Sequence, residues 1–510
     1  MSEKVRSTWN TRAGFLLAAI GSAIGLGNIW RFPYIAYKNG GGAFLIPYAV
    51  AVLVVGIPLL ILEQGIGNLY RASQPMAFAK IRKKFEVFGW WPVVMVMFGI
   101  MLFYTVVLGW CINYLVFSID LSWGADTEAF FHNSFLGITS GPFDFGGLHY
   151  GVLLGTFLVW VLVWFISTRG VRRGLELANK IAIPLLVVLM VIMMVWNLFL
   201  DGSGAGIATF LRPDASRLTD PAVWTDAFSQ VFFSLSVALG IMYAYASYLG
   251  PRAAIVNNSW ITAAANSSFS IFAGMVVFAT LGTMAHATGV PITEVVKGGP
   301  GLAFVIYPKA ISLLPFGSRI FAVLFFLSLL LAGITSAISI LESFVCSAID
   351  KFKASRMKVV TLTCVVGFFG SMIFTTGAGL YWLDIVDYFI MNFGLLTVGL
   401  IEAVIIAWIF GVEKLGKSVN AGSSWKVGRV WRYLLKYATP MVLVVLLVIA
   451  VVDNFKKPYG GYSWTALTII GVGWIVMTIL LSIFISKRRR VEGEEDHMAQ
   501  LGDEGVTIND

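Results

Sequence analysis

Long apolar segments separated by short polar connections occupy this chain from about residue 12 to residue 486. A helix needs roughly 20 apolar residues to cross a bilayer, so the pattern predicts an all-α polytopic membrane protein with about 12 transmembrane helices. The expected spans are 12–37, 42–70, 89–119, 147–167, 175–199, 222–249, 254–288, 318–350, 357–376, 380–411, 434–453 and 464–486.

The first of these spans is interrupted near its middle. Its apolar run contains the poor helix formers Gly21, Ser22, Gly25, Gly27 and Asn28. Lipid cannot hydrogen-bond the backbone groups that a broken helix exposes, so a break at this depth persists where it lines a cavity or binds a solute. We therefore expect this break to be functional.

A similar interruption recurs five helices later. The run 228–248 contains Ser229, Gln230, Ser234, Ser236 and Gly240. Two interrupted helices at matching positions indicate two inverted five-helix repeats, 12–199 and 222–411, with the substrate bound between the breaks. The segment 434–486 would then form two further helices. The alternative is that the small residues serve ordinary helix packing in the membrane.

Charge gives the predicted orientation. Of the 510 residues, 58% are hydrophobic and only 12% are charged, which excludes an ordinary soluble domain. The net charge of +9 comes from basic residues in alternate connections, so the segments 1–11 and 487–510 are expected in the cytoplasm. We expect a multi-pass protein of the plasma (inner) membrane, with lipid but no nucleic acid as a partner. Neither a metal-ligand spacing nor a nucleophile motif is present in the sequence, so an enzyme is not expected.

The broken first span carries a recognisable signature. It reads GSAIGLGNIWRFPYIAYKNGGGAFLIPY, and further matches are GIPLLILEQGIG, FFSLSVALGIMYAYASY, ITAAANSS, GPGLAFVIYP and AGITSAISILES. These motifs resemble the neurotransmitter:sodium symporter family, and the chain looks like a bacterial member similar to LeuT. The resemblance implies the LeuT fold with helices 1 and 6 unwound, and sodium-coupled import of a small molecule by alternating access. It leaves open whether the protein is a monomer or a dimer.

The resemblance implies two sodium sites, built from the oxygen ligands that hard cations prefer. The first would use Ala23, Asn28, Ser234 and Asn266. The second would use Gly21, Ile24, Ala332, Thr335 and Ser336. The alternative for Thr335 and Ser336 is hydrogen bonding to their own helix.

The substrate site follows from the same resemblance. It would be formed by Ala23, Leu26, Gly27, Ile100, Tyr104, Phe233, Ser236, Leu239, Ser336 and Ile340. Monoamine transporters of the family carry an aspartate where this chain has Gly25, so a substrate with its own carboxylate is favoured. We expect a neutral, apolar amino acid, with GABA or a betaine-like osmolyte as the alternative. A channel or an intramembrane enzyme is disfavoured, because a channel predicts a continuous polar pore.

Chloride is a further expected ion. Many bacterial members carry an acidic residue where this chain has Ser270, and chloride-dependent animal members carry a serine. The implied chloride site is Tyr48, Gln230, Ser234 and Ser270. The alternative is that Ser270 only packs against neighbouring helices and that a carboxylate or proton elsewhere compensates.

The resemblance also implies two gates. The outer gate would be Arg31, Asp387, Tyr104 and Phe233, and the inner gate Arg6, Trp9 and Asp350. Exposed ion pairs contribute little, so a solvated surface charge is the alternative for each charged member. We expect Glu63 and Glu402, which lie within spans, to be structural hydrogen-bond centres rather than proton carriers.

Overall fold

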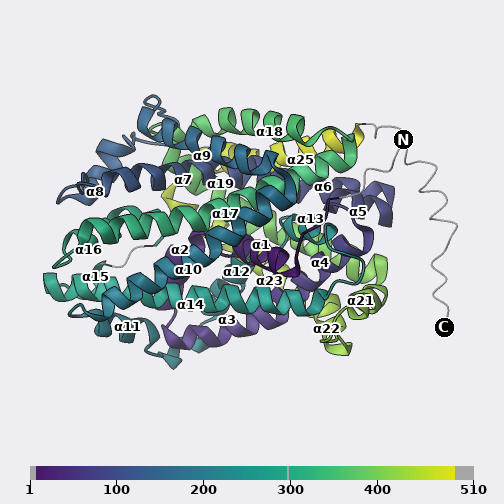
Figure 1. Ribbon diagram of the computed structural model, residues 1–510, viewed down its shortest axis with the longest axis horizontal. Coiled ribbons are helices and arrows are strands. Elements are labelled where there is room, and N and C mark those ends of the chain that lie inside the picture. The colour runs from purple at the N-terminus through teal and green to yellow at the C-terminus, as the bar shows by residue number, and fades with distance from the viewer. Residues whose placement is uncertain (1–6, 296–297, 489–510) are drawn as a thin grey trace.

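The computed structural model describes residues 7–295 and 298–488, and these residues form an almost entirely helical protein (Figure 1). No β-strand occurs in these two ranges, which contain only two isolated bridges, Gly41 with Pro213 and Leu148 with Thr376. Ten helical segments of the described ranges are long and apolar enough to cross a membrane. They are Gly42–Tyr70, Lys83–Phe117, Tyr150–Thr168, Val171–Leu198, Ile255–Thr288, Ser318–Phe352, Arg356–Thr375, Gly379–Ala421, Arg429–Gly461 and Trp464–Lys487. The predicted all-α membrane fold is confirmed.

The first span is broken where the sequence predicts. Helix α1 (Arg12–Ala23) and helix α2 (Leu26–Lys38) meet at an angle of 52° and together make an eleventh crossing. The joining residues, Ile24 and Gly25, are extended. At its other end, α1 begins with Thr11, whose hydroxyl accepts a 2.9 Å hydrogen bond from the N–H of Gly14.

The second break is longer than the first. Helix α12 (Pro221–Ser234) and helix α13 (Ile241–Ser247) replace the single span expected at 222–249. Between them, Ser236, Ala238 and Gly240 have φ values of 52°, 62° and 70°. A non-glycine residue at positive φ is strained and persists only where its surroundings hold it. This segment therefore depends on contacts with its neighbours.

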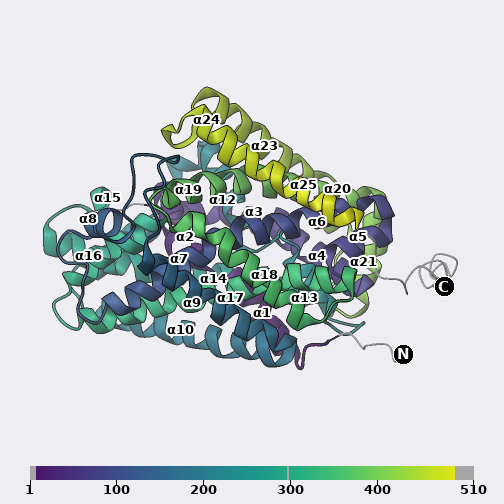
Figure 2. The same ribbon diagram turned by 90° about the horizontal axis from the view of Figure 1, so that it is seen from above.

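The two breaks lie at the centre of the helical bundle. Helix α1 packs against α10 (Leu177–Leu198), α14 (Ile255–Thr288) and α17 (Ser318–Phe352). Helix α13 packs against α4 (Ile57–Tyr70) and α17. In Figure 2, α23 (Thr439–Lys456) and α25 (Gly473–Lys487) lie on one flank and α10 on the opposite flank.

The connections are divided between the two ends of the bundle. Helices α5 (Gln74–Ile81), α21 (Val412–Ala421) and α22 (Arg429–Tyr433), which belong to basic connections, lie at the right-hand end in Figure 1. Helices α8 (Thr127–Ala129), α11 (Ser203–Leu211) and α16 (Tyr307–Ser312) lie at the opposite end. This placement agrees with the charge pattern in the sequence, and the orientation in a cell membrane stays a prediction.

Candidate functional site

A cavity of about 490 Å³ extends from the two breaks toward the end of the bundle that carries α8 and α16. Residues of α1, α2, α12 and the segment 235–240 line it. All the residues expected to contact substrate are among its lining, which includes Ala23, Leu26, Gly27, Ile100, Tyr104, Phe233, Ser236, Leu239, Ser336 and Ile340. The structure therefore brings this predicted set together, and the role of each residue stays a prediction.

Four backbone carbonyl oxygens surround the hydroxyl of Ser336. They belong to Gly21, Ser22, Ile24 and Ala332, at 3.5, 3.3, 3.3 and 3.4 Å from the Ser336 Oγ. One hydroxyl has a single proton to donate, so this cluster has more acceptors than donors. Such a surplus of oxygen atoms suits a hard cation. The Ser22 carbonyl was not among the predicted ligands, because carbonyl directions depend on how the break is bent.

The neighbouring Thr335 behaves differently. Its hydroxyl donates to the carbonyl of Ala332 at 2.9 Å, within its own helix. Hydrogen bonding to its own helix is what the alternative to a sodium-ligand role predicts for Thr335. The same carbonyl also lies near Ser336, so Thr335 borders the oxygen cluster.

Side-chain amides gather on the other side of the first break. The Asn28 Nδ2 lies 2.8 Å from Asn266 Oδ1, 2.7 Å from Ser270 Oγ and 3.3 Å from Ser234 Oγ. The Asn266 Nδ2 donates to Ser234 Oγ at 2.7 Å. Asn28 Oδ1 accepts from the N–H of Gly25 at 2.8 Å. All four side chains are buried, and Ala23 lines the adjoining cavity.

The start of α2 lies at the inner end of the cavity. Its first N–H groups have no partner within the helix, and the helix dipole adds positive potential there. A Cβ atom on Gly25 would lie 3.0 Å from Ser336 Oγ and 3.3 Å from the Tyr104 hydroxyl. A Cβ on Gly27 would overlap the ring of Phe233. Close packing therefore leaves no room for a side chain at Gly27 and little at Gly25, and no carboxylate among the described residues lines this end.

Three of the four predicted chloride residues, Tyr48, Ser234 and Ser270, lie together. The Tyr48 hydroxyl is 3.2 Å from Ser267 Oγ and lies beside the hydroxyls of Ser234 and Ser270. Gln230 is completely buried, and both its Nε2 and its Oε1 lack a hydrogen-bond partner among the described residues. A buried amide donor without a partner is unusual in proteins, so it marks a place for an acceptor. Ser267 was missed because its spacing on α14 resembles that of a packing serine.

The four residues predicted to form the outer gate line the same cavity. The guanidinium of Arg31 lies over the ring of Phe233, 4.7 Å from its centroid. In the described ranges, no ion pair joins Arg31 to Asp387, although both line the cavity with Tyr104 and Phe233. Asp384, which was not predicted, accepts hydrogen bonds from Tyr459 at 2.8 Å and Tyr462 at 2.9 Å.

At the other end of α1 the protein is closely packed. The Trp9 Nε1 donates to the carbonyl of Tyr245 at 2.8 Å, and its ring packs edge-on against Phe15, Tyr245 and Tyr248. Asp350 accepts a 2.8 Å bond from the N–H of Ser73. Arg6, the third predicted member of the inner gate, lies outside the described residues.

An ion pair near Trp9 between the buried Glu342 and the partly exposed Arg356 was not predicted. Arg356 binds both carboxylate oxygens of Glu342, and the Tyr248 hydroxyl donates to Glu342 at 2.7 Å. Arg356 also donates to the carbonyl of Ser167 at 2.8 Å. The acidic residue at the end of AGITSAISILES was the available signal, because an ionised group inside a span needs a partner.

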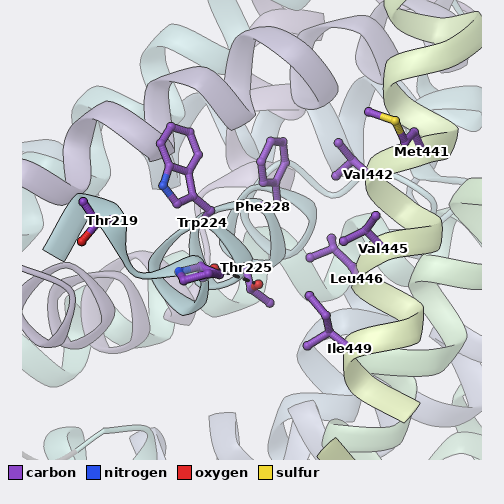
Figure 3. A pocket seen from close by; sticks show the side chains of 10 residues that line it. Thr219, Trp224, Thr225, Phe228, Met441, Val442, Val445, Leu446 and Ile449 are labelled. Atoms are coloured by element: carbon purple, nitrogen blue, oxygen red, sulfur yellow. Dashed lines mark hydrogen bonds between the residues drawn. The ribbon is translucent and has the colours of Figure 1, made fainter. Parts of the chain in front are cut away.

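A second cavity, of about 440 Å³, lies between α12 and α23 (Figure 3). Trp224 and Phe228 project from α12, and Val442, Val445 and Leu446 project from α23. Its lining is almost entirely apolar and includes residues that are exposed on a membrane-spanning helix. It holds none of the predicted ion or substrate residues.

Comparison with known proteins decides the family. The family model described as "Sodium:neurotransmitter symporter family" matches residues 6–129 and 123–491. The chain belongs to the sodium:neurotransmitter symporter family. The predicted resemblance is thus confirmed, and with it a LeuT-like fold.

Curated relatives cover nearly the whole length of this symporter. It is 44% identical to an uncharacterised sodium-dependent transporter of Methanocaldococcus jannaschii, over 97% of this chain and 100% of the relative. It is 31% identical to the sodium- and chloride-dependent GABA transporter 2 of Rattus norvegicus, over 96% of this chain and 88% of the relative. It is also 31% identical to the sodium- and chloride-dependent taurine transporter of Canis lupus familiaris, over 92% of this chain and 82% of the relative. The protein is therefore a sodium-dependent symporter that acts on a small molecule in a membrane, and not an enzyme.

Proposed function

We propose that this symporter imports a neutral, apolar amino acid together with two sodium ions, assisted by chloride. The observation that carries the proposal is the charge distribution in the cavity. At its inner end, Gly25 lies beside Tyr104 and Ser336 and adds no charge. The acidic residues of the lining, Asp384 and Asp387, lie at the opposite end, among the residues proposed for the outer gate. A substrate bound at the break must therefore bring its own carboxylate. The apolar side chains of Ile100, Leu239 and Ile340 favour an uncharged substrate side chain.

The coupling between sodium and substrate would be direct. In the proposed first sodium site, Asn28, Asn266, Ser234 and the carbonyl of Ala23 supply ligands, and the substrate carboxylate completes the set. The N–H groups at the start of α2 and the Tyr104 hydroxyl would bind the same carboxylate. The ion and the anion thus stabilise each other, so neither binds well alone. In the proposed second site, the carbonyls around Ser336 hold an ion that fixes α1 to α17.

Chloride would bind among Tyr48, Gln230, Ser234 and Ser270. The unpartnered Gln230 amide and the surrounding hydroxyls support this proposal, because they are donors and carry no charge of their own. An anion there would offset the charge of the neighbouring sodium ion.

Transport would proceed by alternating access. The cavity reaches the outer gate residues, whereas Trp9 and its aromatic neighbours fill the other end of α1. We propose that both termini are cytoplasmic in the plasma membrane, so that this arrangement faces outward. Each sodium ion that enters would gain about 2.3 kcal/mol per 100 mV of membrane potential.

A second candidate substrate is a longer amino acid such as GABA or a related osmolyte. The relatives described as GABA and taurine transporters favour it. Both candidates have an acidic group at one end and an ammonium at the other, and they differ in the distance between these groups.

The decisive experiment is sodium-dependent ligand binding to the purified full chain. The panel should include neutral α-amino acids, GABA, taurine and betaine, each with sodium or potassium and with chloride or gluconate. We expect a neutral α-amino acid to bind only with sodium and more tightly with chloride. Preferential binding of GABA or taurine would show that the proposed substrate is wrong. Binding that is equally strong with potassium in place of sodium would refute the coupling.

A further inference from the structure

Two buried carboxyl groups lie behind the second break. Glu63 is on α4 and Glu402 is on α20 (Leu395–Val404), and their exposed fractions are 0% and 1%. Glu63 Oε1 accepts a 2.6 Å hydrogen bond from the N–H of Ala238, a residue of the break. Glu402 Oε2 accepts a 3.3 Å bond from Gln74 Nε2, and the two carboxyl groups interact electrostatically. The pair thus connects the break to α20.

The cluster around this pair has few donors. Glu63 Oε2, Gln64 Oε1 and Gln74 Oε1 have no hydrogen-bond partner among the described residues, and the Tyr243 hydroxyl lies beside Glu402. All five side chains are buried. The three unpartnered oxygens can only accept when both carboxyls are ionised, so their hydrogen-bonding capacity is unmet. Buried polar groups without partners are costly, and one added proton would supply a missing donor.

No cation in the described part of the chain compensates the pair. Among the described residues, Tyr243 on α13 is the other titratable group that faces both carboxyls. The charged residues of the elements packed around α4, α5, α13 and α20 are exposed or already engaged. Those that are exposed are Arg12, Arg71, Lys80, Lys83, Lys84, His286, Arg319, Glu413, Lys414, Lys417, Asp453 and Lys456. Those engaged elsewhere are Glu86 with Lys351, Glu342 with Arg356, Asp350 with the Ser73 N–H, and Lys436 over the Trp408 ring.

We propose that Glu63 and Glu402 form a proton-binding site that holds one proton, carried mainly by Glu402. Two ionised carboxylates side by side, without water or a cation, repel each other and lose their hydration. The short N–H bond from Ala238 stabilises the ionised form of Glu63. Glu402 has a long bond from the Gln74 amide, and the Tyr243 hydroxyl beside it can also accept the proton of a neutral acid. The proton is taken up from water, and only the O–H bond of the acid forms.

This site revises the expectation that Glu63 and Glu402 are hydrogen-bond centres without a proton. It also gives the strained segment 235–240 a link to proton binding, because a movement of Ala238 away from Glu63 would remove the bond that keeps Glu63 ionised. The inference does not depend on which solute is transported.

Infrared spectroscopy of the purified full chain tests the site. A buried protonated acid has a C=O stretch that is separate from that of a carboxylate. We expect this band in the unaltered protein at neutral pH, its loss in Glu402→Gln and its retention in Glu63→Gln. The matched control is Glu176→Gln, because Glu176 is buried but bonded to Lys180, and this variant should keep the band. An undiminished band in Glu402→Gln would overturn the proposal.

Thermal stability against pH gives an independent measurement. The folded protein holds a proton that an unfolded glutamate would release at neutral pH, so stability falls as the pH rises toward the release of that proton. For one proton the unfolding equilibrium changes by at most about tenfold per pH unit. Glutamine mimics the protonated acid, so Glu402→Gln should fold and lose this part of the pH dependence. A variant that cannot be folded, or one with an unchanged pH profile, would contradict the proton site.

Discussion

The hydroxyl of Ser236 donates a 2.8 Å hydrogen bond to the carbonyl of Ser22, so one broken helix is bonded directly to the other. Ser22 is next to the end of α1, and Ser236 is a strained residue in the segment that joins α12 to α13. The bond satisfies a carbonyl that the break exposes, and it places both backbones at the end of the cavity. Movement of either break must therefore strain or break this contact.

Replacing Ser236 with alanine should weaken substrate binding about fivefold, because a buried hydrogen bond is worth about 1 kcal/mol. The Ser22 carbonyl would keep only its 3.3 Å contact with the Ser336 hydroxyl. The measurement is the Kd of the substrate found in the binding panel. Ser347→Ala is the control, since the Ser347 hydroxyl donates only to the carbonyl of Ser343 in its own helix. Equal affinities in both variants would mean that the bond between the breaks does not shape the site.

The proposed second sodium site makes a separate prediction. Ser336→Ala removes the hydroxyl at the centre of the carbonyl cluster, and we expect the sodium concentration for half-maximal binding to rise about tenfold or more, since bonds to charged groups are worth about 1.5–3 kcal/mol. Titration of substrate binding with sodium measures it. Ser328→Ala, whose hydroxyl bonds to Leu324 in the same helix, should leave the titration unchanged. A normal sodium requirement in Ser336→Ala would contradict the site.

Several features of this site could be predicted from the sequence, and others could not. The break near Gly25 was predictable because poor helix formers are concentrated within one apolar run. The Ser22 carbonyl was not, because its direction is set by the 52° bend between the two half-helices. Arg356 looked like one of several loop charges, yet it is engaged by Glu342, fourteen residues earlier in the chain. Such pairs depend on how helices end and turn, and hydrophobic periodicity does not report this.

Gly25 provides a test of substrate class. Gly25→Asp should abolish amino-acid binding, because the new carboxylate would lie beside Tyr104 and Ser336 and repel the substrate carboxylate. A substrate amine without a carboxylate should gain affinity. Gly25→Ala separates charge from bulk, because its Cβ meets the same two hydroxyls at 3.0 and 3.3 Å. If both variants lose binding equally, the effect is steric and the charge argument fails.

The dependence of uptake on chloride should be determined by the residue at position 270, which is Ser270 in this chain. In Ser270→Glu a fixed carboxylate would replace the anion, so we expect uptake that is equal in chloride and in gluconate. The unaltered protein should transport more slowly in gluconate. Ser259→Ala, also on α14 and bonded only to its own helix, should keep the response of the unaltered protein. Uptake by the unaltered protein that does not change when gluconate replaces chloride would refute the chloride site.

The Glu342–Arg356 pair should hold the inner side of α17 closed. Glu342→Gln leaves the Arg356 guanidinium with less compensation, and breaking a buried pair costs about 3–5 kcal/mol. The Tyr248 hydroxyl loses a charged acceptor as well, and its ring packs against Trp9. We therefore expect a cysteine placed at Trp9 to react faster with a water-soluble thiol reagent in this variant than in the parent Trp9→Cys protein.

The double variant Glu342→Gln with Arg356→Gln removes both charges, so its loss of folding stability should be smaller than the sum of the losses in the two single variants. Equal labelling rates in all of these proteins would show that the pair stabilises the fold without controlling access to the cavity.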